Sequence, residues 1–305
     1  MGWRMNAATA VSMGFPSIPA LRDMDIATQA ADGHRWTLPL YPADEPVAGL
    51  LWIPALGVPA SKYERMALSL AARDITVAVH EWRGNDTSSL RPSRRCDWGY
   101  RELLTLDMPA SFAVARGRSP EIPWFIGGHS LGGQLAALYL ALSPQAASGL
   151  VLTATGVPHA RTFRGRQRLA ISVFAHLVPW ITRVFGYFPG DRLNWAGREA
   201  ALLMRQWSGT VRSGRYDNLD LPENAETALK QLAQPALGIR FANDWLVPKA
   251  SLDALFGKLG AGDHACELFD ETRLGDRADH FRWMKNPDAV TAVIANWIKH
   301  QSLKS

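Results

Sequence analysis

The sequence is poor in cysteine, with only Cys96 and Cys266 among 305 residues. Two thiols so far apart do not form the disulfide framework on which small secreted domains rely. Neither thiol belongs to a C-x-x-C pair, so the zinc sites built on that spacing are excluded as well. We therefore expect neither a disulfide nor a bound metal ion.

Long apolar runs are also missing. No stretch approaches the roughly 18 uninterrupted apolar residues that a membrane-spanning helix needs, and residues 1–21 lack the continuous apolar segment of a signal peptide. Met13 and Met24 are candidates for the start site, and the sequence does not decide between them and Met1. We expect a cytoplasmic protein without stable membrane insertion.

Positive charge is in small excess, at a formal +5, and it is confined to one segment. Residues 157–234 contain ten Arg and one Lys against six Asp or Glu, which accounts for the whole excess. Such a segment would attract anionic substrates or a membrane surface, although a charged run is more often the solvated face of a helix. No nucleic-acid-binding motif accompanies it, so nucleic acid is not an expected partner.

What the sequence does contain is an alternation of strands and helices. Short apolar runs typical of parallel sheets are separated by helical patterns, which indicates an α/β fold. The predicted strands cover residues 36–41, 49–53, 75–80, 124–127, 150–155, 236–241 and 265–269. The predicted helices cover residues 62–73, 100–114, 134–142, 251–259 and 288–300.

Residues 157–234 interrupt this alternation. They show no strand pattern and contain three helical stretches, at 167–174, 198–207 and 223–232, separated by Pro and Gly. Because the segment lies between two predicted core strands, we expect it to be an inserted helical cap. The core then consists of residues 1–156 and 235–305.

The strongest chemical signal is the motif Gly128-His129-Ser130-Leu131-Gly132, which stands between an apolar strand and a strong helix pattern. In this context a G-x-S-x-G motif forms a nucleophile elbow, a sharp turn that exposes the serine hydroxyl. Ser130 would stand at the start of a helix, where free N–H groups favour negative charge. The N–H of Leu131 is the predicted donor to the oxyanion of a tetrahedral intermediate.

A serine needs a base to become a nucleophile, and the sequence has eight histidines. His280 is the predicted general base, because it lies between the last strand and the last helix, as the order serine, acid, histidine requires. His264 is the alternative, but it precedes a strand and would lie at the opposite end of the sheet. We expect His129 to pack or hydrogen-bond locally beside the serine.

The acid is expected in the loop after the penultimate strand, where Asp244 is the carboxylate. It would hold the tautomer of the imidazole and stabilise the imidazolium, although an Asn-Asp pair also occurs simply as a turn. Asp276 and Asp279, near His280 in sequence, are the fallback acids. A second oxyanion donor is expected from the loop of residues 54–63.

That loop completes a pattern that resembles the α/β-hydrolase superfamily, in particular its serine-aminopeptidase-like and monoglyceride-lipase-like branch. The branch carries a His-Gly-x-Gly loop ending in Arg-Tyr, and Pro54-Ala55-Leu56-Gly57 with Lys62-Tyr63 looks like a variant of it. Gly84 and Ser88 fall on further matching positions, whereas Asp86 replaces a family glycine. Because Ala is strained at positive φ, the exchange of His-Gly for Pro-Ala is expected to change the shape of the loop.

The resemblance covers about residues 50–298 except the cap. It implies an α/β-hydrolase fold with a mostly parallel eight-stranded sheet, a Ser130–Asp244–His280 triad, and the N–H of Leu56 as the second oxyanion donor beside that of Leu131. The activity it implies is hydrolysis through an acyl-enzyme, without a cofactor.

The cap is the predicted determinant of substrate choice because it is rich in aromatic side chains. Above a catalytic serine they would suit an acyl chain or an aromatic group, although most are expected simply to pack the cap onto the core. Residues 185–189 are a weaker candidate for contact with a membrane, since no amphipathic period is clear there. The aromatic residues are Phe163, Phe174, Trp180, Phe185, Tyr187, Phe188, Trp195, Trp207 and Tyr216.

Hydrolysis of a small carboxylic ester is the leading functional hypothesis. Peptide or amide hydrolysis and acyl transfer use the same residues and remain open. Two rivals come from other classes: a non-catalytic binding protein on the same fold, and a protein that binds anionic lipid or nucleic acid through the Arg-rich segment. The oligomeric state stays open.

Overall fold

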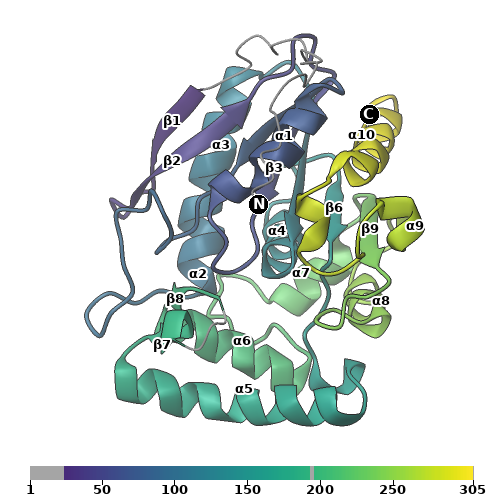
Figure 1. Ribbon diagram of the computed structural model, residues 1–305. Coiled ribbons are helices and arrows are strands. Elements are labelled where there is room, and N and C mark those ends of the chain that lie inside the picture. The colour runs from purple at the N-terminus through teal and green to yellow at the C-terminus, as the bar shows by residue number, and fades with distance from the viewer. Residues whose placement is uncertain (1–23, 193–195, 305) are drawn as a thin grey trace, which may run out of the picture.

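An eight-stranded sheet runs through the centre of the protein (Figure 1). The computed structural model describes residues 24–192 and 196–304; the start segment 1–21 and Trp195 lie outside these ranges. The strands are β1 (Met24–Gln29), β2 (Arg35–Tyr41), β3 (Ala48–Ile53), β4 (Ile75–Val79), β5 (Trp124–His129), β6 (Leu150–Thr153), β9 (Ala236–Phe241) and β10 (His264–Phe269). Their order is β1-β2-β4-β3-β5-β6-β9-β10. β2 is antiparallel to both β1 and β4, and the other neighbours are parallel.

All seven predicted strands are present, and the mostly parallel sheet confirms the predicted α/β fold. The strand that the sequence did not reveal is β1. Its residues include Asp25, Thr28 and Gln29, so it lacks an apolar run. It is an edge strand whose conformation comes from pairing with β2 along its whole length, which is information that local sequence does not carry.

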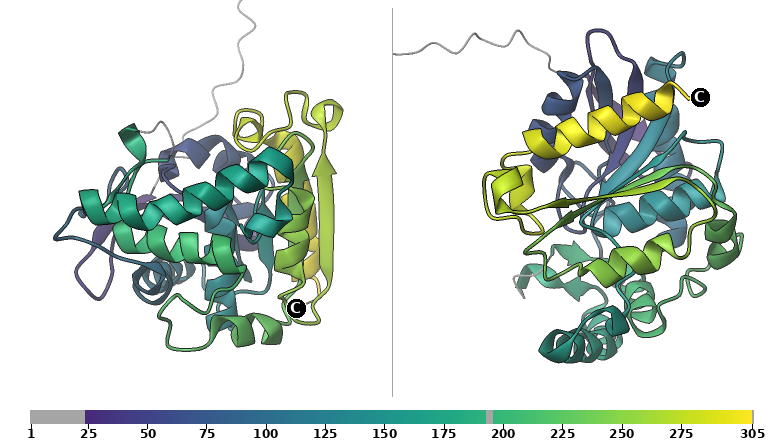
Figure 2. Two further views of the ribbon diagram at one scale, coloured as in Figure 1. Left: turned by 90° about the horizontal axis from the view of Figure 1, so that it is seen from below. Right: turned by 90° about the vertical axis from the view of Figure 1, so that its right-hand side faces the viewer.

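Helices cover both faces of the sheet. On one side lie α1 (Glu64–Ala71) and α10 (Asp288–Ser302); on the other lie α3 (Met108–Arg118), α4 (Leu131–Leu142) and α8 (Lys249–Phe256). Figure 2 shows the sheet between these two layers. The apolar side chains form two separate cores, one on each face, as expected when parallel strands are buried on both sides.

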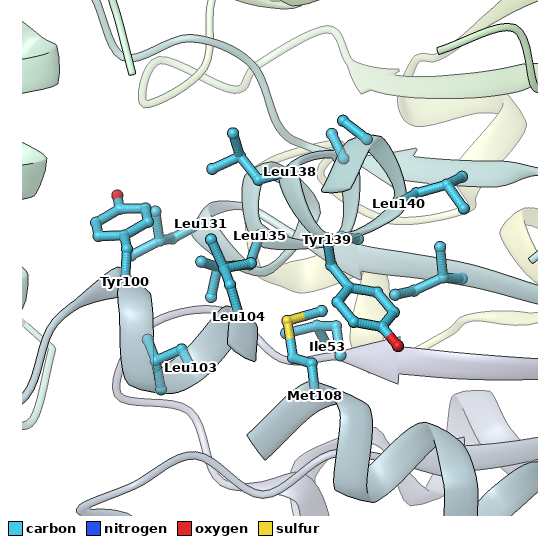
Figure 3. Close-up of a cluster of buried hydrophobic side chains, with 14 of the residues drawn as sticks. Ile53, Tyr100, Leu103, Leu104, Met108, Leu131, Leu135, Leu138, Tyr139 and Leu140 are labelled. Carbon is cyan, nitrogen blue, oxygen red and sulfur yellow. The ribbon is translucent and has the colours of Figure 1, made fainter. Parts of the chain in front are cut away.

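The central helix α4 is buried along all but its last residue. A helix that is apolar on every side belongs in the interior of a protein. Figure 3 shows Leu131 and Leu135 of this helix near Tyr100 and Leu104 of a neighbouring helical segment. The first turn of α4 is therefore anchored in the core, and this fixes the position of the residue that precedes it.

The predicted helix over residues 100–114 is not continuous. It consists of α2 (Tyr100–Glu102), a π-helical turn (Leu103–Asp107) and then α3. The irregularity lies just before Pro109. The extra residue of a π turn accompanies the buried carboxylate of Asp107, which accepts hydrogen bonds from Arg83 at 2.6 and 2.8 Å.

Residues 157–234 contain two helices that lie side by side at one end of the molecule (Figure 1), and a shorter helix that packs against α4. They contain α5 (Gly165–Phe185), α6 (Ala201–Ser213), α7 (Ala225–Gln231) and two-residue strands β7 (Phe188–Pro189) and β8 (Arg198–Glu199). The short strands were not expected. Helix α5 is also longer than the predicted stretch 167–174, because it continues through Pro179 to Phe185. It ends at Gly186, whose φ of 80° lies in the left-handed region that favours glycine.

Candidate active site

The turn between β5 and α4 has the geometry that the G-x-S-x-G motif predicts. Ser130 has φ 56° and ψ −123°, a strained conformation for a residue other than glycine. The flanking glycines have no room for a side chain. A Cβ on Gly128 would lie 2.4 Å from the carbonyl carbon of Gly132, and a Cβ on Gly132 would lie 2.2 Å from the carbonyl oxygen of Ile53. These contacts make both glycines necessary for so sharp a turn.

Two loops at the same end of the sheet bring Asp244 and His280 together. Nδ1 of His280 donates a hydrogen bond to Oδ2 of Asp244 at 2.8 Å, and the two side chains are only 5% and 1% exposed. The other carboxylate oxygen accepts the N–H groups of Leu246 and Val247 at 2.9 and 3.0 Å. With Nδ1 committed to the carboxylate, Nε2 is the basic nitrogen of His280.

The loops that carry the acid and the histidine are also tied to each other. The N–H of Asn243 donates to the carbonyl oxygen of Ala278 at 2.8 Å. This bond fixes the carboxylate of Asp244 relative to the imidazole of His280 without any ligand.

The rival residues lie elsewhere. Asp276 faces Arg282 at 3.3 Å, and Asp279 accepts the N–H groups of Phe281 and Arg282. His264 begins β10, and its imidazole contacts the carbonyl oxygen of Gly260 at 3.2 Å. The distance of His264 from the loops that follow the strands agrees with the sequence-based expectation.

A cavity of about 1000 Å³ lies between the core and the cap, and both Ser130 and His280 line it. Most of its other lining residues are apolar, from the loop after β3, from α5 and from the loop after β9. Among the described residues that line it, Arg166 carries the one fixed charge. The serine and the histidine thus open onto a largely apolar chamber.

The two predicted oxyanion donors, Leu56 and Leu131, both line this cavity beside Ser130. Within the described part of the chain, neither backbone N–H donates to a protein acceptor. The strain anticipated at Ala55 is not present, because the left-handed position of the loop is Gly57, at φ 71°. A Cβ on Gly57 would lie 2.4 Å from the backbone nitrogen of Gly197 in the cap.

Sequence reasoning missed a hydrogen-bonded relay behind the site. The hydroxyl of Tyr63 accepts the N–H of Ala55 at 2.9 Å and donates to Nδ1 of His129 at 2.8 Å. Burial raises the pKa of Tyr63 far above its ordinary value, so the hydroxyl keeps its proton. Burial, with His280 nearby, holds the pKa of His129 well below its ordinary value, so this imidazole is neutral. The rings of His129 and His280 stand 4.8 Å apart.

The relay therefore links the loop of residues 54–63, which we call the oxyanion loop, to His129, the residue before Ser130. Through His129 it also reaches the neighbourhood of His280. The variant Lys62-Tyr63 of the family's Arg-Tyr pair was the signal in the sequence that pointed to Tyr63. It did not indicate the partner, because His129 is 66 residues away along the chain.

Tyr63→Phe is expected to lower the free energy of unfolding by about 1–3 kcal/mol, because it leaves a buried donor and a buried acceptor unpaired. It should also reduce kcat for an ester substrate more than it changes KM, since the oxyanion loop loses its anchor. Urea denaturation and steady-state kinetics measure the two effects. The matched control is Tyr100→Phe, whose buried hydroxyl has no hydrogen-bond partner among the described residues. Equal losses in the two variants would contradict the relay.

A buried glutamate ties the oxyanion loop to the strand beside it. Glu81 accepts the N–H groups of Ala60 and Trp82 at 3.3 and 3.1 Å, and the indole of Trp82 donates to the carbonyl oxygen of Pro54 at 3.0 Å. Burial raises the pKa of Glu81 from 4.5 to about 7. The carboxyl group is consequently half protonated near neutral pH in the folded protein.

This raised pKa sets the direction of a pH effect on stability. Between pH 4.5 and about 7 the folded protein keeps a proton on Glu81 that the unfolded chain releases. As the pH rises across this range, the free energy of unfolding should fall by a contribution on the order of 3 kcal/mol. Above about pH 7 this contribution should no longer change. In urea denaturation at pH 5 and pH 8, Glu81→Gln should show a smaller fall than the wild type. Glu45→Gln, at an exposed position, is the control, and an undiminished fall in Glu81→Gln would contradict the assignment.

The side chains that could bind a metal ion do not form a cluster among the described residues. Cys96 and Cys266 are free thiols, and the described residues contain no group of three or more His, Cys, Asp or Glu side chains suited to a metal ion. The residues that line the cavity include Ser130, His280 with its imidazole held by Asp244, and the two leucines Leu56 and Leu131.

A strained serine between a strand and a helix, with a histidine and a carboxylate on later loops of a mostly parallel sheet, defines the α/β-hydrolase class. The sequence pattern described as serine aminopeptidase, S33, matches residues 44–273, which is most of the chain. The protein belongs to this family of hydrolases, and the match confirms the resemblance seen in the sequence.

Solved structures share the fold over nearly the whole chain. A soluble variant of monoglyceride lipase from Saccharomyces cerevisiae is 14% identical with a TM-score of 0.64, covering 95% of this chain and 98% of that one. A putative lipase from Acinetobacter baumannii is 16% identical with a TM-score of 0.62 and covers 93% and 94%. A thermophilic esterase from Thermogutta terrifontis is 15% identical with a TM-score of 0.60 and covers 92% and 99%. A search of curated proteins gave no match. At these identities the likeness concerns the fold.

Proposed function

We propose that the protein hydrolyses carboxylic esters, with Ser130 as nucleophile, His280 as general base and Asp244 as the acid that orients it. The observation that carries this proposal is the buried 2.8 Å hydrogen bond between Asp244 and His280, together with a cavity that His280 and the strained Ser130 both line.

The reaction follows from these positions. Oγ of Ser130 attacks the ester carbonyl carbon while Nε2 of His280 takes the hydroxyl proton. The N–H groups of Leu131 and Leu56 hold the oxyanion of the tetrahedral intermediate. Its collapse breaks the bond to the alcohol, which leaves with the proton from His280. Water then attacks the acyl-enzyme with His280 again as base, which releases the carboxylic acid and restores Ser130.

The cavity favours an apolar acyl group. A volume of about 1000 Å³ with mostly apolar lining suits an acyl chain bound by burial of hydrocarbon. An aminopeptidase would need an anionic group for the substrate's α-ammonium, yet the described lining residues include Arg166 and no Asp or Glu. We therefore prefer an ester of a small molecule over a peptide, and the reaction calls for no cofactor. Two of the structures reported above are named as a monoglyceride lipase and an esterase, which agrees with this preference.

Graded substrates test the preference. The p-nitrophenyl esters of acetic to dodecanoic acid should be hydrolysed, with kcat/KM rising as the acyl chain fills the cavity. Alanine p-nitroanilide should react at least about 100-fold more slowly, because its ammonium group has no partner in the cavity. Faster cleavage of the anilide would favour a peptidase. If the folded protein hydrolyses neither compound, the non-catalytic rival replaces the enzyme.

A further inference from the structure

The outward face of α5 is apolar. Its exposed residues recur in steps of four, four, three and four, which places them on one side of a helix. Single exposed apolar side chains are ordinary, whereas a continuous stripe marks a surface that binds something. The stripe consists of Leu169, Val173, Leu177, Trp180 and Val184, which are 67%, 49%, 49%, 69% and 62% exposed.

This outward stripe plays no part in holding the cap together. The buried side chains of α5, Ala175, Val178 and Thr182, belong to its opposite side, and that side packs against α6. Figure 1 shows α5 at the outer edge of the cap, with α6 beside it. The fold therefore accounts for one side of the helix and leaves the other unexplained.

By length and composition alone, α5 is the one described helix that would suffice to cross a membrane. Because one side is packed against α6 and borders the cavity, the helix is placed to lie along a surface instead of spanning it. Helices that lie in the membrane interface combine an apolar face with basic residues.

Basic residues occur in and just before α5. Between residues 157 and 190 the chain has five Arg and no Asp or Glu. All five are exposed, and none forms an ion pair within the described residues. This uncompensated charge, in the same segment as the apolar stripe, is complementary to anionic lipid headgroups. The five are Arg161, Arg164, Arg166, Arg168 and Arg183.

The stripe is continuous with the mouth of the cavity. Arg166, Gln167 and Ala170, at the beginning of α5, are exposed and also line the cavity that contains Ser130. A lipid surface in contact with the stripe would consequently meet the entrance to the catalytic chamber.

We propose that α5 docks the protein reversibly onto an anionic lipid surface, with its outward stripe among the lipid chains and its arginines on the headgroups. The weaker sequence-based candidate for a membrane contact, residues 185–189, lies at the end of this helix. The stripe was not apparent because the predicted helix ended at residue 174.

Vesicle flotation tests the docking surface, using the full chain with Ser130→Ala so that no lipid is hydrolysed. Binding should be at least about tenfold tighter to vesicles of phosphatidylcholine with one-third phosphatidylglycerol than to phosphatidylcholine alone, and should weaken as salt is added. Leu177→Glu with Trp180→Glu should reduce this binding about tenfold or more. Leu268→Glu, an exposed apolar residue on β10, should leave it unchanged.

The contribution of charge has its own pair of variants. Arg168→Gln with Arg183→Gln should weaken binding to the anionic vesicles and flatten its salt dependence. Arg116→Gln with Lys230→Gln, which removes the same charge from exposed positions outside α5, should do neither.

Three results would overturn the docking surface. They are absence of binding to anionic vesicles, equal binding to both kinds of vesicle, and equal effects of the α5 and β10 variants. A concentration-dependent dimer that is lost in Leu177→Glu with Trp180→Glu, without lipid binding, would assign the stripe to a second copy of the chain. Hydrolysis of a short soluble ester should be unaffected by these α5 variants, because none of the substituted residues lines the cavity; failure of the docking surface and failure of the proposed chemistry are thereby distinguished.

Discussion

Ser130→Ala is expected to lower kcat for the best p-nitrophenyl ester by a factor on the order of 10⁴ or more, because it removes the nucleophile that forms the acyl-enzyme. The backbone conformation at this position is equally strained for Ala and Ser, so the fold and its stability should be retained. Initial rates measure the loss, with the enzyme concentration taken from the protein concentration. Circular dichroism verifies that the variant is folded.

Ser251→Ala is the matched control. Ser251 also lines the cavity, but its hydroxyl is paired with that of Thr162 at 2.7 Å. Its removal should change kcat by no more than a few-fold. Comparable losses at the two serines, or substantial activity in Ser130→Ala, would contradict the assignment of the nucleophile.

Asp244→Asn is expected to cost about 10⁴-fold in kcat with little change in structure. The amide oxygen would keep the N–H groups of Leu246 and Val247, which now donate to Oδ1. The amide nitrogen would then face Nδ1 of His280, which must accept instead of donate. The imidazole proton moves to Nε2, and the base can no longer take a proton from Ser130.

The fallback acids provide the comparison. Asp276→Asn and Asp279→Asn alter side chains that face Arg282 and the backbone of the same loop, so each should retain most of the activity. Steady-state kinetics of the three variants measures the ranking. A larger loss of kcat in Asp276→Asn or Asp279→Asn than in Asp244→Asn would assign the role of the acid to that residue instead.

The sequence predicted the parts of the fold that depend on local apolar patterns. β9 has the predicted ends, and α4 follows the predicted elbow, because buried strands and helices carry dense apolar runs. β1 was missed because its polar edge-strand sequence depends on pairing with β2. The length of α5 was missed because Pro179 suggests a helix end, whereas the structure continues the helix through it.

In the candidate site, too, some residues could be predicted from the sequence and others could not. Ser130 and Leu131 follow from a motif of adjacent residues, and Asp244 and His280 follow from the order of strands and loops. The contact of Tyr63 with Ala55 and His129 did not follow, because it depends on how two loops and a strand end meet in space. The exposed stripe on α5 could not be predicted either, because the sequence does not tell which side of the helix is buried.

Mass spectrometry of the protein treated with a fluorophosphonate probe tests the central claim most directly, because only an activated serine reacts rapidly with such a probe. The proposed chemistry predicts one adduct, on the peptide that contains Ser130, and none in Ser130→Ala. An unlabelled but folded wild-type protein, or an adduct on another serine such as Ser251, would contradict it.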